Sequence, residues 1–189
     1  SLNNMGRVYQ AWSQYDKAME NYQQALAIAR RLGTEDGIAG VLSNMGEVYQ
    51  AWGQYDKAIE NYQQALTSFR KLGKEVGIAT TLNSLGMVYD SWGQYDKAIE
   101  NYQQALTLYR KLGTEDGIAL FHFKIGKAYN SWGQYDKAVK NYQPGLAIVR
   151  RLEKEEEIAL FLGDIGAAYR GWGQYDKAIE HYQQALTLS

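Results

Sequence analysis

The sequence has 189 residues, of which 46% are hydrophobic, and its 20 basic and 21 acidic residues leave a formal net charge of −1. This balance lacks the basic excess that binding to nucleic acid or to an anionic membrane requires, so neither is expected as the main partner. Because the chain contains no cysteine, disulfide bonds, thiolate nucleophiles and zinc sites built on sulfur are excluded.

Targeting signals are missing from the sequence. No apolar run approaches the roughly 18 residues that a membrane-spanning helix needs, and the N-terminus lacks the basic and then apolar pattern of a signal peptide. We therefore expect a cytoplasmic location. The sequence begins at Ser1 without an initiator methionine and stops at Ser189 partway through a repeating pattern, so we expect a fragment of a longer array.

An internal repeat dominates the chain. Fifteen of the 16 tyrosines fall into three series with a spacing of 40 residues. Self-similarity at such a period indicates stacked supersecondary units and not one closed core. One glycine series and one tryptophan series keep the same spacing: Gly6, Gly46, Gly86, Gly126 and Gly166, and Trp12, Trp52, Trp92, Trp132 and Trp172.

Each repeat contains two predicted helices. In the second repeat, apolar residues recur at helical spacing over residues 42–52 and again over residues 55–69, and Gly53-Gln54 interrupts the pattern. The pattern therefore predicts a helix, a tight turn and a longer helix. Glycine follows the second helix, as in Leu32-Gly33, which is a helix stop signal. Thr34 is then placed to cap the next first helix with its side chain.

The fourth repeat departs from this pattern twice. Pro144-Gly145 replaces Gln-Ala inside the second helix, where proline costs about 3 kcal/mol and glycine roughly 1 kcal/mol. Residues 152–157 replace the glycine-containing connection with glutamates and a lysine, which are good helix formers. We expect a kinked helix that runs on toward the fifth repeat through an altered junction, which is either a hinge or tolerated drift.

The repeat resembles the tetratricopeptide repeat, whose signature places an apolar residue, Gly, Tyr, Ala and an aromatic residue at matching offsets. The period of 40 and the missing proline after the second helix make it similar to the extended variety of kinesin light chains, mitotic-orientation scaffolds and multidomain bacterial signalling proteins. The residues that carry the resemblance in the second repeat are Leu42, Met45, Gly46, Tyr49, Gly53, Tyr55, Ala58, Tyr62 and Ala65.

The resemblance implies an all-α, right-handed superhelical solenoid of about five helix-turn-helix repeats. We expect a single domain over residues 1–189, with repeats at approximately 1–36, 37–76, 77–116, 117–156 and 157–189. The repeated glycines are expected to let two helices approach closely, and the repeated tryptophans to pack at the end of each first helix.

A candidate binding groove lies on the polar side of the first helices. At 100° per residue, Leu42, Met45 and Tyr49 share one side of the helix, while Glu47 and Gln50 lie on the other. In the family the first helices line the concave surface, so the resemblance implies that the polar side forms a peptide-binding groove. The candidate groove residues are Asn3, Asn4, Arg7, Asn44, Glu47, Gln50, Asn83, Asp90, Lys127 and Asn130.

The asparagines are the strongest candidates among them. A carboxamide donates to a peptide C=O and accepts from a peptide N–H at once, which suits an extended backbone of any sequence. The series is broken by Ser84, Lys124 and Asp164. Two interpretations stay open at this point: a binding surface that varies on a uniform scaffold, and exposed polar positions that drift freely.

No constellation typical of an enzyme is present. The two histidines, His122 and His181, hold different places in the repeat, with His122 at a core-facing leucine position and His181 at a surface asparagine position. Neither has a second histidine nearby for a metal site, and no glycine-rich phosphate loop occurs. We expect no catalytic activity, no cofactor and no metal.

Two functions from different classes remain. The first is a protein-binding or peptide-binding scaffold or adaptor module that uses the groove. The alternative is a structural array that stacks on itself end to end without a dedicated peptide ligand, because near-identical repeats without polar capping helices leave apolar ends that fit one another.

Overall fold

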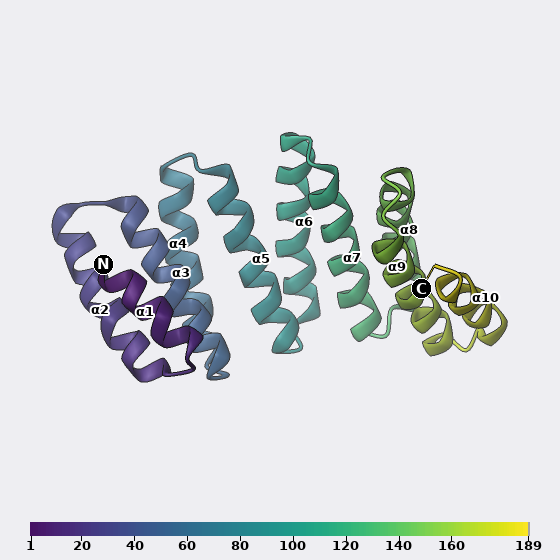
Figure 1. Cartoon of the computed structure of the whole chain (residues 1–189), viewed down its shortest axis with the longest axis horizontal. Helices are drawn as coiled ribbons and strands as arrows, with labels where there is room; N and C mark the ends of the chain where they lie inside the picture. Colours follow the sequence, from purple (N-terminus) through teal and green to yellow (C-terminus); the bar gives the residue numbers. More distant parts are fainter. Residues whose placement is uncertain (189) are drawn as a thin grey trace. The chain divides into compact units, whose positions relative to one another are not determined.

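In the computed structural model, the described residues 1–188 form ten α-helices and no strand (Figure 1). A tight turn or a short connection separates each helix from the next, so the all-α class and the helix-turn-helix repeats are confirmed. The helices are α1 (Leu2–Ala11), α2 (Tyr15–Leu32), α3 (Glu35–Ala51), α4 (Tyr55–Lys71), α5 (Glu75–Ser91), α6 (Tyr95–Leu112), α7 (Glu115–Ser131), α8 (Tyr135–Arg151), α9 (Glu155–Gly171) and α10 (Tyr175–Leu186).

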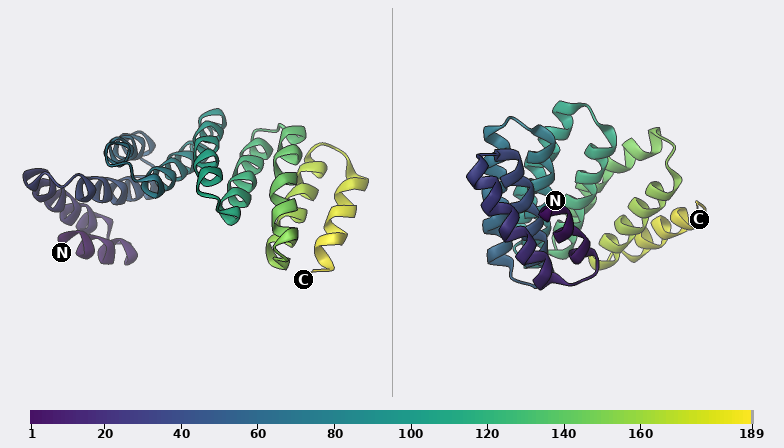
Figure 2. Two further views of the ribbon diagram at one scale, coloured as in Figure 1. Left: turned by 90° about the horizontal axis from the view of Figure 1, so that it is seen from above. Right: turned by 60° about the vertical axis from the view of Figure 1, so that its left-hand side comes forward.

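The chain divides into two compact units, residues 1–92 with α1 to α5 (unit 1) and residues 93–189 with α6 to α10 (unit 2). In unit 1, each helix packs on the next from α1 to α5, and α1 also contacts α3. In unit 2, α6 to α10 follow the same order, and α7 also contacts α9. Figure 2 shows these neighbouring helices running antiparallel within each unit. One continuous solenoid domain stays a prediction.

The core of unit 1 lies between the second helix of one repeat and the first helix of the next. Tyr22 and Leu26 of α2 are buried against Leu42 and Met45 of α3. These residues recur at the three- and four-residue spacings that place them on one side of each helix. Burying each such side chain contributes roughly 1.5–3 kcal/mol, so packing between repeats carries much of the stability.

Glycine lets a tyrosine ring pass directly against each first helix. A Cβ atom placed on Gly46 lies 2.8 Å from Cε1 of Tyr62, and one on Gly6 lies 2.5 Å from Cε1 of Tyr22. Both tyrosine side chains are buried. The expected close approach is confirmed, and its partner is the ring of the second-helix tyrosine.

The turn between α8 and α9 corrects the expectation for the fourth repeat. Helix α8 contains Pro144 but ends at Arg151, so it does not run on, and α9 begins at Glu155. Glu153 takes a left-handed conformation with φ of 56°, close to the 65° of Gly73 at the same place in unit 1. The turn lets α9 pack against α8 and bury Phe161. This burial outweighs the tendency of the glutamates to continue the helix.

A stability prediction follows from that turn. Left-handed backbone costs a residue with a Cβ roughly 1–2 kcal/mol, and glycine avoids the clash. We expect Glu153→Gly to raise the free energy of unfolding by about 1 kcal/mol, measured by urea denaturation. Glu156→Gly, inside the first turn of α9, is the control and should lower it by about 1 kcal/mol. Equal destabilisation by both changes contradicts the account of the turn.

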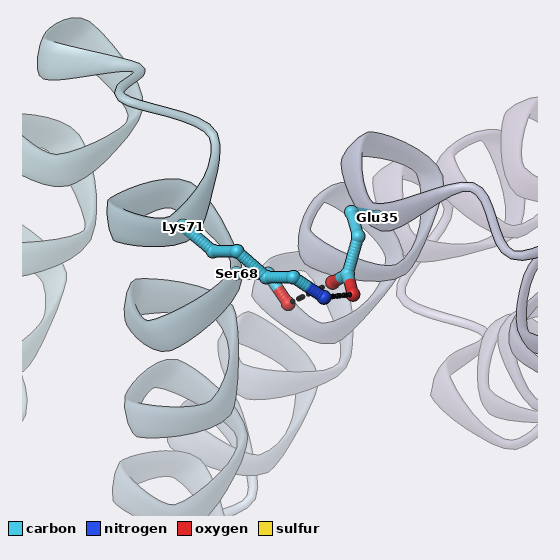
Figure 3. A network of polar contacts seen from close by, with 3 residues as sticks. All are labelled: Glu35, Ser68 and Lys71. Atoms are coloured by element: carbon cyan, nitrogen blue, oxygen red, sulfur yellow. Dashed lines mark hydrogen bonds and ion pairs between the residues drawn. The ribbon is translucent and has the colours of Figure 1, made fainter.

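The start of α3 is held to α4 by a small polar network (Figure 3). Glu35 accepts hydrogen bonds from Ser68 Oγ at 2.9 Å and from the Lys71 ammonium, and the Lys71 contact is the main reason that the pKa of Glu35 is lowered. Thr34 stands at the N-cap position, but its hydroxyl donates to the carbonyl of Ala29 at 3.3 Å. The expected side-chain cap is wrong, because the Thr34 hydroxyl accepts no hydrogen bond from the first turn of α3 and instead bonds the end of α2.

The same arrangement recurs in unit 2. Arg151 bonds Glu115 at 2.8 Å, in the register of the Glu35–Lys71 pair. Lys154 bonds Asp116 at 2.9 Å, in the register of the Lys74–Asp36 pair of unit 1. These ion pairs are largely exposed, so each contributes at most about 1 kcal/mol. They form part of the repeat architecture.

The tryptophans pack less closely than expected. Trp52 contacts the rings of Tyr49 and Tyr15 edge-on, with centroids 5.9 and 6.3 Å away, but it stays 36% exposed, and Trp12 is 66% exposed. The expected packing at the end of the first helix is found, yet the indole rings remain partly open to solvent.

Candidate functional site

The structure divides the candidate groove residues between the two units. Asn3, Asn4, Arg7, Asn44, Glu47, Gln50, Asn83 and Asp90 lie in unit 1, on α1, α3 and α5, and Lys127 and Asn130 lie in unit 2, on α7. We call the polar side of α1, α3 and α5 the unit 1 face, and that of α7 and α9 the unit 2 face. None of these residues belongs to the buried core.

Two of the asparagines bond each other across neighbouring first helices. Asn44 Nδ2 donates to Asn3 Oδ1 at 2.9 Å, and both side chains are half-buried. This contact leaves the amide group of Asn3 as a donor and Oδ1 of Asn44 as an acceptor. The pair is therefore a fixed bridge between α1 and α3 with hydrogen-bonding capacity left on both side chains, whereas Asn4 is exposed beside it.

A second chain of hydrogen bonds crosses the unit 1 face. Tyr22 Oη donates to Gln10 Oε1 at 2.7 Å, and Gln10 Nε2 donates to Glu47 Oε2 at 2.8 Å. The three side chains come from α2, α1 and α3. Burial, and then the negative charge of Glu47, raise the pKa of Tyr22 to about 12. The hydroxyl therefore stays protonated and acts as the donor that orients Gln10.

Further along the face, Asn83 presents a polar atom that unit 1 does not satisfy. Asn83 Nδ2 contacts Met87 Sδ at 3.6 Å, while Asn83 Oδ1 is buried without a hydrogen-bond partner. Burial and the charge of Glu47 raise the pKa of Tyr62. Such orphaned groups are uncommon in proteins and mark positions where a donor or acceptor from outside is favoured.

The second-helix tyrosines are members of the site that the sequence interpretation missed. Tyr22 and Tyr62 were assigned to the repeat scaffold, but their hydroxyls reach the polar side of the first helices beside Gln10 and Glu47. A signal for them existed, because a glycine precedes each of these tyrosines by 16 residues, as in Gly6 and Tyr22. Because glycine has no Cβ atom, the tyrosine ring can lie directly against the first helix at that position.

The unit 2 face carries a different mixture of groups. Lys127 Nζ lies 5.8 Å from the centre of the Phe123 ring, a cation–π contact. Burial raises the pKa of Asp164, while the charge of Lys127 lowers it. Burial, and then the charge of Asp164, raise the pKa of Tyr142. Asn130 Oδ1 is buried without a hydrogen-bond partner. The face therefore combines an aromatic surface with charges of both signs.

The acidic and histidine side chains of the described residues form no metal-binding cluster. Over residues 1–188, no group of three or more His, Cys, Asp or Glu side chains is arranged to hold a metal ion. His122 is buried at 7% exposure, as expected, and His181 Nδ1 bonds the carbonyl of Lys177 within its own helix at 2.8 Å. None of the helices in this range is long and apolar enough to span a bilayer.

Comparisons with solved structures show where the fold recurs. BtubC (BKLC) from P. vanneervenii is 26% identical with a TM-score of 0.86, and the match covers 99% of this chain and 78% of that one. A kinesin light chain-like protein of Podospora anserina with nearly identical TPR-like repeats is 23% identical, with a TM-score of 0.86 and coverages of 99% and 92%.

A Rap protein in complex with competence and sporulation factor is 20% identical with a TM-score of 0.72, and the match covers 99% of this chain and 52% of that chain. No curated protein matches the sequence. The family model of the tetratricopeptide repeat matches residues 37–111 and 118–189, and a second model of the same repeat matches residues 1–32. These models cover well over half of the sequence, so the chain belongs to the tetratricopeptide repeat family.

Proposed function

We propose that this chain is a scaffold or adaptor module whose first-helix faces bind a peptide or a segment of another protein. The observation that carries the proposal is the pair of polar chains on the unit 1 face, Asn3–Asn44 and Tyr22–Gln10–Glu47. Both chains link neighbouring helices, which fixes the side chains in place. Each still holds unused hydrogen-bonding capacity, the combination that a preorganised backbone-binding site requires.

The pattern of sequence variation among the repeats supports the same function. The exposed first-helix position changes from Arg7 to Glu47, Met87 and Lys127 in successive repeats. The second-helix segment Gln-Tyr-Asp-Lys-Ala is identical in all five repeats. A constant scaffold with a varied face is typical of recognition by repeat proteins. The Rap protein of similar fold that holds competence and sporulation factor shares only the fold with this chain, but it agrees with peptide binding.

The test is selection of peptides from a random 12-residue library displayed on phage, followed by affinity measurement. The variant Asn3→Ala/Asn44→Ala/Asn83→Ala should weaken the selected peptides about 30-fold, since each lost hydrogen bond costs roughly 0.5–1.5 kcal/mol. The matched control is Asn21→Ala/Asn61→Ala/Asn101→Ala. Those asparagines donate to the carbonyls of Lys17, Lys57 and Lys97 within their own second helices.

The control should bind as the unchanged protein does. Equal weakening by both triple variants, or selection of no peptide at all, counts against the proposed groove.

End-to-end self-association is the second candidate, and one observation favours it. Ile179 of α10 is 54% exposed, whereas Val139 at the same place in α8 is 6% exposed. Met5 of α1 is likewise 50% exposed, against 7% for Met45 of α3. In this chain such positions pack against each other where one repeat meets the next, so the α10 face of one copy matches the α1 face of another.

Sedimentation equilibrium tests the second candidate. Mass that rises steadily with concentration and returns to the monomer value in Ile179→Lys supports stacking. A constant monomer mass rejects it.

A further inference from the structure

An apolar hollow of about 160 Å³ lies on the unit 2 face, between the first helices α7 and α9 and beside the end of α8. Ala119, Phe123 and Phe161 line it together with Val149, and Phe123 and Phe161 meet edge-on with centroids 5.1 Å apart. An apolar cavity of roughly 150 Å³ accepts a benzene-sized group. The hollow therefore has room for one large aliphatic or aromatic side chain.

Two exposed leucines border the hollow and belong to the same face. Leu120 of α7 is 48% exposed and Leu160 of α9 is 52% exposed. The corresponding positions in unit 1 are Gly40 and Thr80, so the core does not require leucine there. The two exposed leucines lie beside Phe123 and Phe161 and give the unit 2 face an apolar contact area. The unit 1 face has no leucine at the corresponding positions.

Asp116, Glu157 and Lys154 line the hollow, and further carboxylates stand in the same first turns of α7 and α9; we call the carboxylates of these two turns the acidic rim. The first turns of α7 and α9 hold five carboxylates, Glu115, Asp116, Glu155, Glu156 and Glu157. Two cations pair with this group: Arg151 bonds Glu115, and Lys154 bonds both Asp116 and Glu157. Three negative charges remain in excess. The pairs to Glu115 and Asp116 repeat those of unit 1 and are structural, so the excess comes from the glutamates of α9.

Resting on the proposed function of the first-helix faces, we propose that the unit 2 hollow receives a large apolar side chain of a peptide bound on the unit 2 face and that a neighbouring lysine or arginine of that peptide meets the acidic rim. The apolar side chain gains from leaving water, at roughly 25 cal/mol per Å² buried. The basic neighbour gains from the uncompensated glutamates at the start of α9, a contribution that added salt screens. The apolar hollow and the acidic rim together favour peptides in which a large apolar residue is next to a lysine or an arginine.

The experiment uses the 189-residue protein and the peptides selected from the random library. The selected peptides should carry an apolar residue next to lysine or arginine. Leu120→Thr/Leu160→Thr, which installs the residue of Thr80 in unit 1, should weaken them at least about tenfold. The control Leu32→Thr/Leu72→Thr changes two similarly exposed leucines of unit 1 and should leave the affinity unchanged. Replacing the basic residue of a selected peptide by glutamate should weaken binding to a similar extent.

The outcomes separate this inference from the proposed function. If no selected peptide is weakened by Leu120→Thr/Leu160→Thr, the hollow is overturned, while weakening by Asn3→Ala/Asn44→Ala/Asn83→Ala leaves the unit 1 face standing. Selected peptides without basic residues, or with affinities that do not change between 50 mM and 500 mM salt, overturn the role of the acidic rim. Selection of no peptide rejects both proposals together.

Discussion

Replacing Tyr62 by alanine is expected to lower the free energy of unfolding by about 4 kcal/mol, the cost of deleting a buried aromatic side chain. Tyr62 is 1% exposed, and its ring lies against Gly46. Alanine leaves a cavity beneath α3, because the glycine has no side chain that can fill the space. Urea denaturation followed by circular dichroism measures the change.

Two control variants isolate the ring from its hydroxyl and from surface effects. Tyr62→Phe keeps the ring and removes a hydroxyl that lies near the Ser84 side chain, so stability should change by no more than about 1.5 kcal/mol, the net contribution of one hydrogen bond. Tyr175→Ala removes a tyrosine that is 66% exposed and should cost well under 2 kcal/mol. A loss below about 2 kcal/mol for Tyr62→Ala contradicts the glycine–tyrosine packing described above.

Replacing His122 by leucine is expected to remove most of the acid sensitivity of the protein. His122 is buried on α7 where the other repeats have leucine, and its Nε2 lies 3.3 Å from a guanidinium nitrogen of Arg110 on α6. Burial, and next the charge of Arg110, lower the pKa of His122, while a contact with the backbone of Asn141 opposes the shift. Protonation therefore favours the unfolded chain.

The direction of the pH effect follows from that lowered pKa. Above the unfolded value of about 6.5, neither state binds the proton, and stability is constant. Below it the unfolded chain takes up a proton that the folded chain resists, so stability falls by up to about 1.4 kcal/mol per pH unit until the folded pKa is reached.

Denaturation between pH 7.5 and pH 5 measures this slope. His122→Leu should flatten it, whereas the control His181→Asn, which installs the residue of the other repeats, should keep it. An unchanged slope in His122→Leu rules out His122 as its source.

Much of the fold was predictable because the same pattern of glycine, tyrosine and tryptophan recurs along the chain. Glycine, tyrosine and tryptophan at a spacing of 40 residues define a helix, a turn and a second helix, and the observed helices begin and end where these signals stand. The exception at Glu153 is informative. Local helix propensity favoured a continuous helix there, but burial of Phe161 at the junction of α8 and α9 favours a turn that is strained without glycine.

The candidate site was predictable in location but not in detail. Helical periodicity placed Asn3, Asn44 and Asn83 on the polar side of the first helices, and the structure leaves them outside the core. The hydrogen bond from Asn44 to Asn3 depends on the distance between α1 and α3. The periodicity of a single helix gives no information about that distance. The hollow at Leu120 was missed for the same reason, because its aromatic floor comes from α7 and α9 together.

The central claim, that the first-helix faces bind a peptide, is tested most directly by nuclear magnetic resonance of the side-chain amides. A ¹⁵N-labelled protein is titrated with a peptide selected from the random library. The account predicts shifts at the amide groups of Asn3, Asn44 and Asn83, with no change at the second-helix amides of Asn21, Asn61 and Asn101. Shifts confined to the second-helix asparagines would place the ligand on the other side of the helix pairs and contradict the claim.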